Sequence, residues 1–289
     1  MTLGVRWFGG VGGVLALVAC VGVTASSADA TVGLRSTFDT STQGWTPAEI
    51  ADPFEWRAGG GNPGGHITSA RGTGGTAGAD SPSSWAGNRS TAYGGTISFD
   101  IRLDPGIVGQ PLEVILDSSN PGIGDLWVSF GSVSIPDWER RVVRLAPSPQ
   151  WNREGSAPVN RTAFEEVLGS LGRVRIAAGL AQTDDRIYFD NITLASDVKR
   201  SLTLKRRAKR FFGKLRPLNP CAKRQKVTIF RKRGGPDAKL KTVRTDARGE
   251  YGFRAASPRR GRYYASAARS FAAGGGNCLA ARSKTVAVG

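Results

Sequence analysis

The stretch that decides the fold is SSWAGNRSTAYGGTISFDI, residues 83–101. A Gly-Asn turn and a Tyr-Gly-Gly segment lead into a run in which every second residue, starting at Ile97, is apolar. Apolar side chains at a period of two predict a strand with one face in a core. Trp85 and Tyr93 stand where a sugar-stacking platform could lie. We interpret them mainly as framework residues at the lip of a β-sandwich.

The same alternation recurs at residues 112–117 and 173–180, with turn sequences such as NPGIGD between the runs. Strands that alternate in this way are typical of antiparallel sheets with one face on a core and one in water. Residues 59–78 are so rich in Gly that they predict a loop. The sequence therefore predicts an all-β fold, with an antiparallel sandwich over residues 31–196.

One short helix is expected at TAFEEVLGSLG, residues 162–172. Thr162 and Glu165 have the spacing of a capping box, and Phe164 and Val167 begin an apolar stripe. Gly172 is expected to end the helix.

Residues 85–103, the segment VSIPDWERRVVRL at 133–145, and the run that ends in YFDNITL at Leu194 resemble the laminin IV type A domain, also called laminin B. The resemblance spans residues 38–195. It implies a domain similar to the galactose-binding-like jelly rolls that house many carbohydrate-binding modules. In laminins the domain is a structural module without known catalysis, so the resemblance implies work in an extracellular matrix or cell envelope.

The two ends of this domain, FDTSTQGW from residue 38 and YFDNITL from residue 188, are similar to the first and last strands of carbohydrate-binding jelly rolls. There, a carboxylate near each end often shares a structural Ca²⁺, which takes hard oxygen ligands. The resemblance places Asp39 and Asp190 at these positions. The alternative is that Asp39 caps a turn and Asp190 orders the last strand.

A carbohydrate site is expected around Trp127, since six of the seven Trp lie in the first domain. Leu126, Val128 and Phe130 alternate with Trp127, so a strand that buries them turns Trp127 outward. Arg175 and Asp100 are the candidate hydrogen-bonding partners for a sugar. The alternative is that Trp127 packs under a loop, as large aromatic residues usually do.

Catalytic patterns are weak, and the sequence predicts a protein that is not an enzyme. His66 is the single His and lies in a Gly-rich segment, and no G-x-S-x-G elbow marks a nucleophile. The carboxylate pairs at residues 165–166 and 184–185 fall in the capping box and in a turn. The alternative is a carbohydrate-active hydrolase or an accessory module of one, and a second alternative is a purely structural extracellular protein.

Export is predicted from the N-terminus. Arg6, the apolar run 11–23 and Ala-Asp-Ala at 28–30 have the order of a secretory signal peptide cleaved after Ala30. The competing interpretation is a lipobox at residues 17–20 that would anchor the chain as a lipoprotein at Cys20. No second apolar run follows, so no transmembrane segment is expected.

Charge divides the chain near Ser196. Residues 31–196 carry 13 Arg and 18 Asp and Glu, a net charge of −5, whereas residues 197–289 carry 26 Lys and Arg against 4 Asp and Glu, a net charge of +22. The second part resembles the transthyretin-like or carboxypeptidase regulatory-like β-sandwich in TDARGEYGF and GRYYASA. We expect a second, smaller β-sandwich there, with a disulfide between Cys221 and Cys278 because export favours pairing.

The basic clusters of the second part are expected to bind an anionic polymer or surface of the cell envelope, because guanidinium groups pair well with phosphates and carboxylates. Nucleic acid is not expected as the physiological partner of an exported protein. The alternative is simple solubilising charge. The candidate residues are Lys205, Arg206, Arg207, Lys209, Arg210, Arg231, Lys232 and Arg233.

Overall fold

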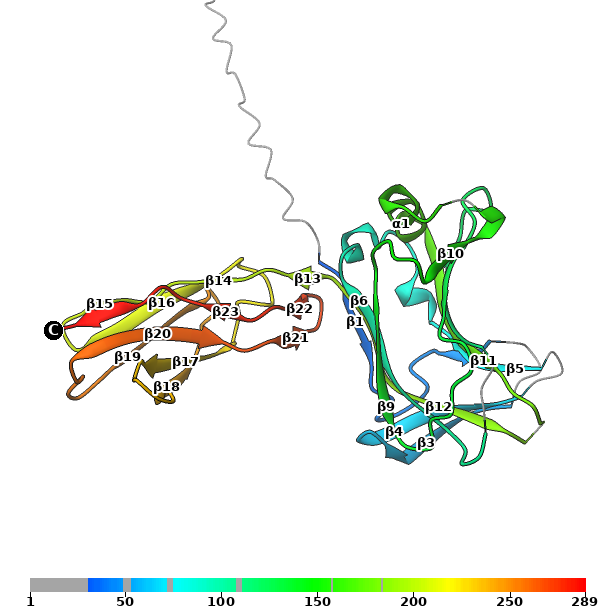
Figure 1. Cartoon of the computed structure of the whole chain (residues 1–289), viewed down its shortest axis with the longest axis horizontal. Helices are drawn as coiled ribbons and strands as arrows, with labels where there is room; N and C mark the ends of the chain where they lie inside the picture. Colours follow the sequence, from blue (N-terminus) through cyan, green and yellow to red (C-terminus); the bar gives the residue numbers. More distant parts are fainter. Residues whose placement is uncertain (1–30, 49–52, 72–74, 108–110, 157, 183) are drawn as a thin grey trace, which may run out of the picture.

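The structure is a computed structural model that describes residues 31–48, 53–71, 75–107, 111–156, 158–182 and 184–289. The predicted signal peptide and Cys20 lie outside the described residues. Two β bodies follow each other along the chain: a first domain, residues 31–196, and an elongated second domain, residues 197–289 (Figure 1). Within the described ranges, no helix is long and apolar enough to cross a membrane.

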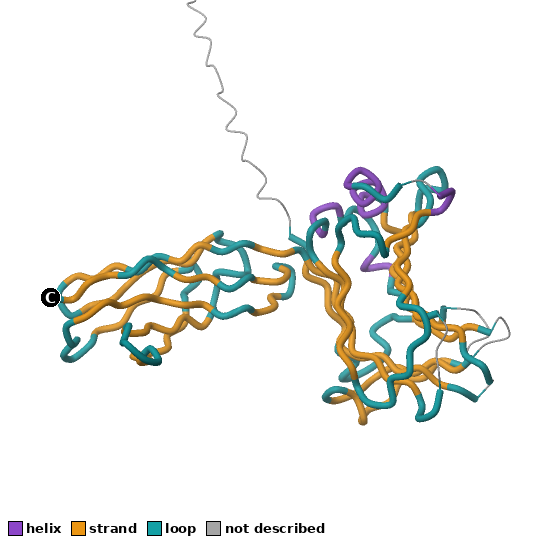
Figure 2. Tube along the Cα trace, in the orientation of Figure 1, coloured by secondary structure: helices purple, strands orange, loops and turns teal. Residues whose placement is uncertain are grey.

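The first domain is a sandwich of two antiparallel sheets (Figure 2). One sheet, named sheet A here, has the order β3-β4-β12-β6-β9, with β1 also paired to β12. The other, sheet B, has the order β10-β8-β7-β11-β5-β2. The strands of sheet A are β1 (Gly33–Ser36), β3 (Phe54–Gly61), β4 (Gly64–Ala70), β6 (Thr96–Leu103), β9 (Glu139–Arg144) and β12 (Arg186–Ala195). Those of sheet B are β2 (Thr46–Pro47), β5 (Thr76–Asp80), β7 (Leu112–Ser118), β8 (Leu126–Ser129), β10 (Trp151–Arg153) and β11 (Leu171–Gly179).

The core between the sheets is made by the alternating residues. In β6, Ile97, Phe99 and Ile101 are fully buried, and β7 buries Leu112 and Leu116 from the other sheet. The predicted all-β fold is confirmed. Trp85 and Tyr93 belong to the framework: Trp85 contacts Trp45 edge to face at 5.1 Å, and the Tyr93 ring lies 6.1 Å from that of Phe164.

The Gly-rich stretch is not a loop, and that prediction was wrong. Most of residues 59–78 belong to β3, β4 and β5. Glycine has no side chain to show a period of two, so strands rich in it look like loops in the sequence. Gly78 is required in β5, because a Cβ there would lie 2.5 Å from the carbonyl oxygen of Ile176 on β11.

The helix forms with different boundaries from those expected. α1 spans Arg161–Gly169, and its N-cap is Asn160, whose side chain accepts a hydrogen bond from the Ala163 backbone N–H at 2.9 Å. Thr162 therefore lies inside the helix, and Gly172 lies in β11. An Asn two residues upstream of Thr162 satisfies the same orphan N–H groups, so the capping box is not used. Short 3₁₀ turns span Ser83–Trp85, Ser90–Ala92 and Glu154–Ser156.

The second domain is a smaller β-sandwich. One sheet has the order β14-β16-β15 with β19 on β16, and the facing sheet has the order β18-β17-β20-β23 with β24 on β20. The strands are β14 (Ser201–Leu202), β15 (Lys205–Arg207), β16 (Arg210–Arg216), β17 (Lys226–Arg231), β18 (Ala238–Arg244), β19 (Glu250–Arg254), β20 (Gly261–Ala267), β23 (Ala281–Arg282) and β24 (Val286–Val288). Its core centres on Phe211, Ile229 and Tyr263.

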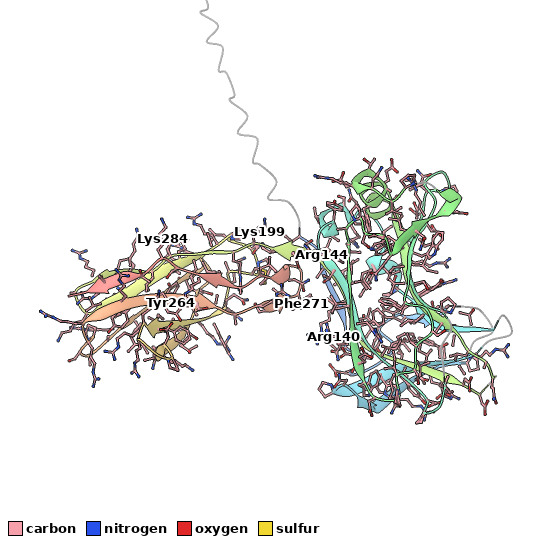
Figure 3. All side chains as sticks on the ribbon, in the orientation of Figure 1. Arg140, Arg144, Lys199, Tyr264, Phe271 and Lys284 are labelled. Carbon is pink, nitrogen blue, oxygen red and sulfur yellow. A yellow bond between two sulfur atoms is a disulfide. The ribbon has the colours of Figure 1, made fainter. Side chains whose placement is uncertain are left out.

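A third, three-stranded sheet joins the domains: β13 (Asp197–Val198), β22 (Gly276–Cys278) and β21 (Ser270–Ala272). The β21–β22 hairpin lies against β1, as the Gly274 backbone N–H donates to Gly33 O at 3.0 Å. Gly276, at φ +83°, is so close that a Cβ would lie 2.5 Å from Ser196 O. Arg144 and Phe271 mark the two sides of this junction in Figure 3.

Side-chain bonds also cross the junction. Asn277 donates to Thr96 Oγ1 at 2.9 Å, and Arg144 pairs with Asp197 at 2.6 Å. The expected disulfide between Cys221 and Cys278 is present, with the Cα atoms 5.3 Å apart. Cys278 is in β22, and Cys221 lies in the loop between β16 and β17. The disulfide therefore ties the β21–β22 hairpin, which contacts the first domain, to that loop of the second domain.

The junction yields a prediction about cooperativity. Gly276→Ala is expected to push the hairpin off the first domain, since the new methyl group overlaps Ser196 O, and to split one calorimetric unfolding transition into two. Gly274→Ala is the matched control, because Gly274 also has positive φ, +65°, but a Cβ there meets nothing within 4 Å. Equal calorimetric traces for the two variants would contradict the account.

Candidate functional sites

Trp127 lies on the outer face of sheet B, as the alternation predicts. Leu126 and Val128 on either side of it are buried, and Trp127 itself is half-buried. Across the sheet, Trp127 is paired with Ile115 of β7, which is paired with Arg175 of β11. Trp127 and Arg175 therefore share one face, separated by one strand.

The guanidinium group of Arg175 is already engaged. It donates to both oxygens of Asp80, at 2.7 and 2.9 Å, and to Ala48 O at 2.6 Å. Asp100 is not part of this face at all: it lies on the outer face of sheet A and is 3 % exposed. The structure thus brings Arg175, but not Asp100, onto the sheet of Trp127. The sequence could not predict this difference, because side-chain alternation does not show which of two sheets a strand joins.

Asp100 belongs instead to a buried polar cluster with Asp190. Asp190 is fully buried, and its two oxygens accept backbone N–H bonds from Asn62 and Asn191, both at 2.6 Å. Asp100 accepts from the Asn191 amide at 2.9 Å and pairs with Arg140 at 2.8 Å. This network fastens the β3–β4 turn onto β12 and β6.

Asp39 lies beside the same turn, where its Oδ1 would be 2.5 Å from a Cβ on Gly64, and its Oδ2 accepts from the Thr37 hydroxyl at 2.7 Å. Asp39 and Asp190 offer hard oxygens, yet both oxygens of Asp190 are engaged by N–H donors. Across the described residues, no group of three or more His, Cys, Asp or Glu is placed to hold a metal ion. Structural calcium at Asp39 and Asp190 stays a prediction.

Three carboxylates of the pairs 165–166 and 184–185 have partners at the surface. Glu165 pairs with Arg161, Glu166 pairs with Arg153, and Asp185 accepts from the Gln182 backbone N–H.

The basic clusters of the second domain gather at the end farthest from the first domain, near the C-terminus (Figure 1). We call this end the cationic tip. Arg207 of β15 is paired with Arg210 of β16, and Arg210 is paired with Arg254 of β19. With Lys209, these three line a hollow of about 690 Å³.

The loop between β19 and β20 joins the two predicted clusters. Its first residue, Ala255, donates to Lys209 O at 2.9 Å, and it leads into Gly261, the first residue of β20, which lies beside Arg231. A second hollow of about 300 Å³ is lined by cations that include Arg231, Arg233 and Arg259. The cationic tip thus comprises Arg207, Lys209, Arg210, Arg231, Lys232, Arg233, Arg254, Arg259, Arg260 and Arg262.

Two predicted residues are not part of the arginine row. Arg206 is half-buried and is paired with the buried Phe211, so it faces inward. Lys205 faces outward toward a groove of about 860 Å³ along β15, β16 and β19, which Arg207 and Arg210 also line. Residues 254 and 259–262 were missed from the sequence; the arginine-rich SPRRGR, following a strand that pairs with β16, is the signal that indicates them.

Asp190 has the strongest shift among the carboxylates. Burial, which outweighs the N–H bonds from Asn62 and Asn191, raises its pKa to about 6, and the charges of Asp100 and Asp39 add to the rise. Because the folded pKa is above the ordinary value of 3.8, the folded state binds the proton more tightly. This group's contribution to stability is full below pH 4 and is lost as the pH rises through about 6.

A carboxyl ¹³C NMR titration checks this directly, with Asp190→Asn identifying the resonance. The expected midpoint is about 6, and a midpoint below 4 would contradict the assignment. Repeating the titration with Ca²⁺ tests the calcium prediction, because a bound cation stabilises the carboxylate and lowers the midpoint. An unchanged midpoint removes Asp39 and Asp190 from consideration as metal ligands.

Comparison with known proteins finds similarity mainly in the first domain. Residues 80–210 match the family model described as Laminin B (Domain IV). Similar solved structures include the L4b domain of human laminin alpha-2, with 16 % identity, a TM-score of 0.38, and coverage of 45 % of this chain and 79 % of that one. Another is the family 11 carbohydrate-binding module of Clostridium thermocellum in complex with a β-1,3-1,4-mixed-linked tetrasaccharide, with 18 % identity, a TM-score of 0.38, and coverage of 57 % and 96 %. No curated protein matches the chain. From residue 80 to the first strands of the second domain, the chain is therefore similar to laminin B domains.

Proposed function

We propose that the chain is an exported, non-enzymatic binding or adhesion protein. The first domain binds carbohydrate, and the cationic tip of the second domain associates with an anionic polymer of the envelope or extracellular space. The laminin B match and the disulfide support an extracellular setting, because disulfides persist in oxidising compartments.

The observation that carries the proposal is the arginine row at the tip. Arg207, Arg210 and Arg254 are exposed cross-strand neighbours on one sheet. Like charges directly opposite each other destabilise a sheet, so the row costs folding free energy that an anionic partner would return. In the second domain as described, the carboxylates Glu250 and Asp237 pair with Lys214 and Arg282, and none pairs with the row.

The position of the tip supports attachment to a surface. The tip and the first domain lie at opposite ends of the molecule (Figure 1). A polymer held at the tip would leave the outer faces of sheets A and B open. Sugar binding on sheet B would use the half-buried Trp127, whose indole can offer one apolar face and one N–H.

Neutralising the arginine row tests the tip. Arg207→Gln, Arg210→Gln and Arg254→Gln together are expected to weaken binding to long-chain inorganic polyphosphate and flatten its salt dependence, because fewer counterions are released. The same variant should be at least as stable as the parent. Isothermal titration across a salt series measures both affinity and slope.

The charge-matched control for that experiment is Lys223→Gln, Arg224→Gln and Lys226→Gln. These cations are equally exposed but lie at the junction end of the second domain. Equal losses in the two triple variants would show that only net charge matters and would contradict a tip site.

Retention of soluble polysaccharides by the full chain tests the carbohydrate part. We expect a neutral glycan on an array to be retained without product release, and Trp127→Ala to lose that retention because the exposed aromatic face is gone. Release of shorter sugars would instead show a hydrolase. Unchanged retention by Trp127→Ala would move the site away from sheet B.

A further inference from the structure

A pocket of about 370 Å³ opens on the outer face of sheet A, on the opposite side of the sandwich from Trp127. Thr68 of β4, Tyr188 of β12 and Arg102 of β6 are cross-strand neighbours along its floor. Arg57, His66 and Arg186 also line it. The volume is within the range of small-molecule sites, at its lower end.

Unpartnered polar atoms concentrate in this pocket. Seven buried side-chain nitrogen or oxygen atoms lack a hydrogen-bond partner among the described residues, and four of them belong to its lining. They are Thr68 Oγ1, His66 Nδ1, Arg102 Nε and Arg186 Nη1. Thr68 is 1 % exposed and His66 is 5 % exposed, so neither side chain is a surface group that water satisfies freely. Buried polar groups without partners are costly, which indicates that something polar fills the pocket.

The charges around the pocket favour an anion. Arg57, Arg102 and Arg186 face it, and the nearby carboxylates are Glu55, which pairs with Arg57 and Arg186, and Asp104, which accepts from the Tyr188 hydroxyl at 2.6 Å. Three guanidinium groups against two carboxylates leave a surplus of one positive charge. A ligand with a single negative charge balances it.

Two aromatic rings, and not an ion pair, position the side chain of Arg102. Its guanidinium group lies 4.2 Å from the centre of the Tyr188 ring and 5.5 Å from that of Trp138. Trp138 is itself fixed by a hydrogen bond from Nε1 to Gly60 O at 3.0 Å. Stacking of this kind sets the plane of the guanidinium and leaves its edge free for a planar carboxylate.

His66 and Thr68 supply the complementary groups for hydroxyls. Burial, and then the charge of Arg102, lower the pKa of His66, whereas a hydrogen bond to the Gly59 backbone raises it. By geometry, Nδ1 has no hydrogen-bond partner among the described residues, and an imidazole nitrogen without a proton can accept. Thr68 Oγ1 can donate or accept. The pocket therefore presents guanidinium donors for one carboxylate beside acceptors for hydroxyl groups.

From this geometry we infer that the pocket binds a uronic acid residue of an acidic saccharide, with its carboxylate on Arg102 and Arg186 and its hydroxyls on His66 and Thr68. A uronic acid carries one carboxylate and several hydroxyls on a single ring. These groups complement the unpartnered guanidinium, imidazole and hydroxyl atoms of the lining. This site goes beyond the proposed function and does not depend on Trp127, because the two lie on different sheets.

The single His of the chain makes the test direct. Untagged full-length protein is titrated with trigalacturonate at physiological salt, while the ¹H and ¹⁵N resonances of the His66 imidazole are followed by NMR. The expected result is a saturable shift of these resonances by trigalacturonate and none by a neutral galactose trisaccharide. If trigalacturonate binds only at the cationic tip, the His66 resonances do not shift, and that outcome overturns the inference.

Two variants report on the contacts. Thr68→Val removes an unpartnered hydroxyl at nearly constant shape, so the fold is retained while affinity for trigalacturonate falls about threefold or more. Arg102→Gln removes a charged donor and is expected to weaken binding about tenfold or more. Arg141→Gln is the matched control, since Arg141 also has a buried unpartnered Nε and stacks on Phe130 at 5.8 Å, but outside the pocket.

The outcomes separate the alternatives. Unchanged affinity in both Thr68→Val and Arg102→Gln, or an equal loss in Arg141→Gln, overturns the site. A sulfated galactose trisaccharide that binds as tightly as trigalacturonate overturns the carboxylate assignment. Loss of neutral-glycan retention in Trp127→Ala with trigalacturonate binding intact confirms that the two faces act separately.

Discussion

The close approach of Gly276 to the first domain is the constraint on which the rest of the structure depends. A Cβ at this position would lie 2.5 Å from Ser196 O and 2.7 Å from Val32 O. The hairpin can therefore approach β1 and β13 this closely only if residue 276 is glycine. The disulfide between Cys221 and Cys278 then fastens the hairpin to the second domain. Two domains of opposite charge are thereby joined through hydrogen-bonded strands.

Because the junction joins the two domains end to end, it separates their opposite charges. The acidic first domain and the cationic tip are at opposite ends of the molecule, and two cations near the junction are engaged: Arg144 with Asp197, and Arg200 with three backbone carbonyls. The arginine row at the tip has no such partners among the described residues. Attachment at one end and saccharide binding at the other are therefore compatible in one molecule, with sheets A and B offering two distinct faces.

Much of the fold could be predicted because side-chain alternation reports directly on which face of a strand is buried. That rule placed Ile97 and Phe99 in the core and turned Trp127 outward. It failed at β3 and β5, because glycine carries no period. A different rule, the capping-box spacing of Thr162 and Glu165, misplaced the N-terminus of α1, because Asn160 is the N-cap.

The sites were harder to predict, because they are assembled by strand pairing. Asp100 and Arg175 look equivalent in sequence but lie on different sheets. The sheet A pocket joins Thr68, Tyr188 and Arg102 from three strands across more than a hundred residues, and the sequence shows His66 only as a residue in a glycine-rich run. Only part of the cationic tip could be predicted. The basic runs at residues 205–210 and 231–233 were evident in the sequence, but the loop between β19 and β20 that brings them together was not.

The central claim is that one molecule holds an anionic surface at its tip while its first domain binds saccharide. A quartz crystal microbalance loaded with polyphosphate, then with the full-length protein, then with trigalacturonate, tests it most directly. The account predicts that saccharide is captured while the protein layer stays in place, and that Arg102→Gln weakens the capture but not the layer. Release of the protein by trigalacturonate would show that one site serves both ligands and would contradict the account.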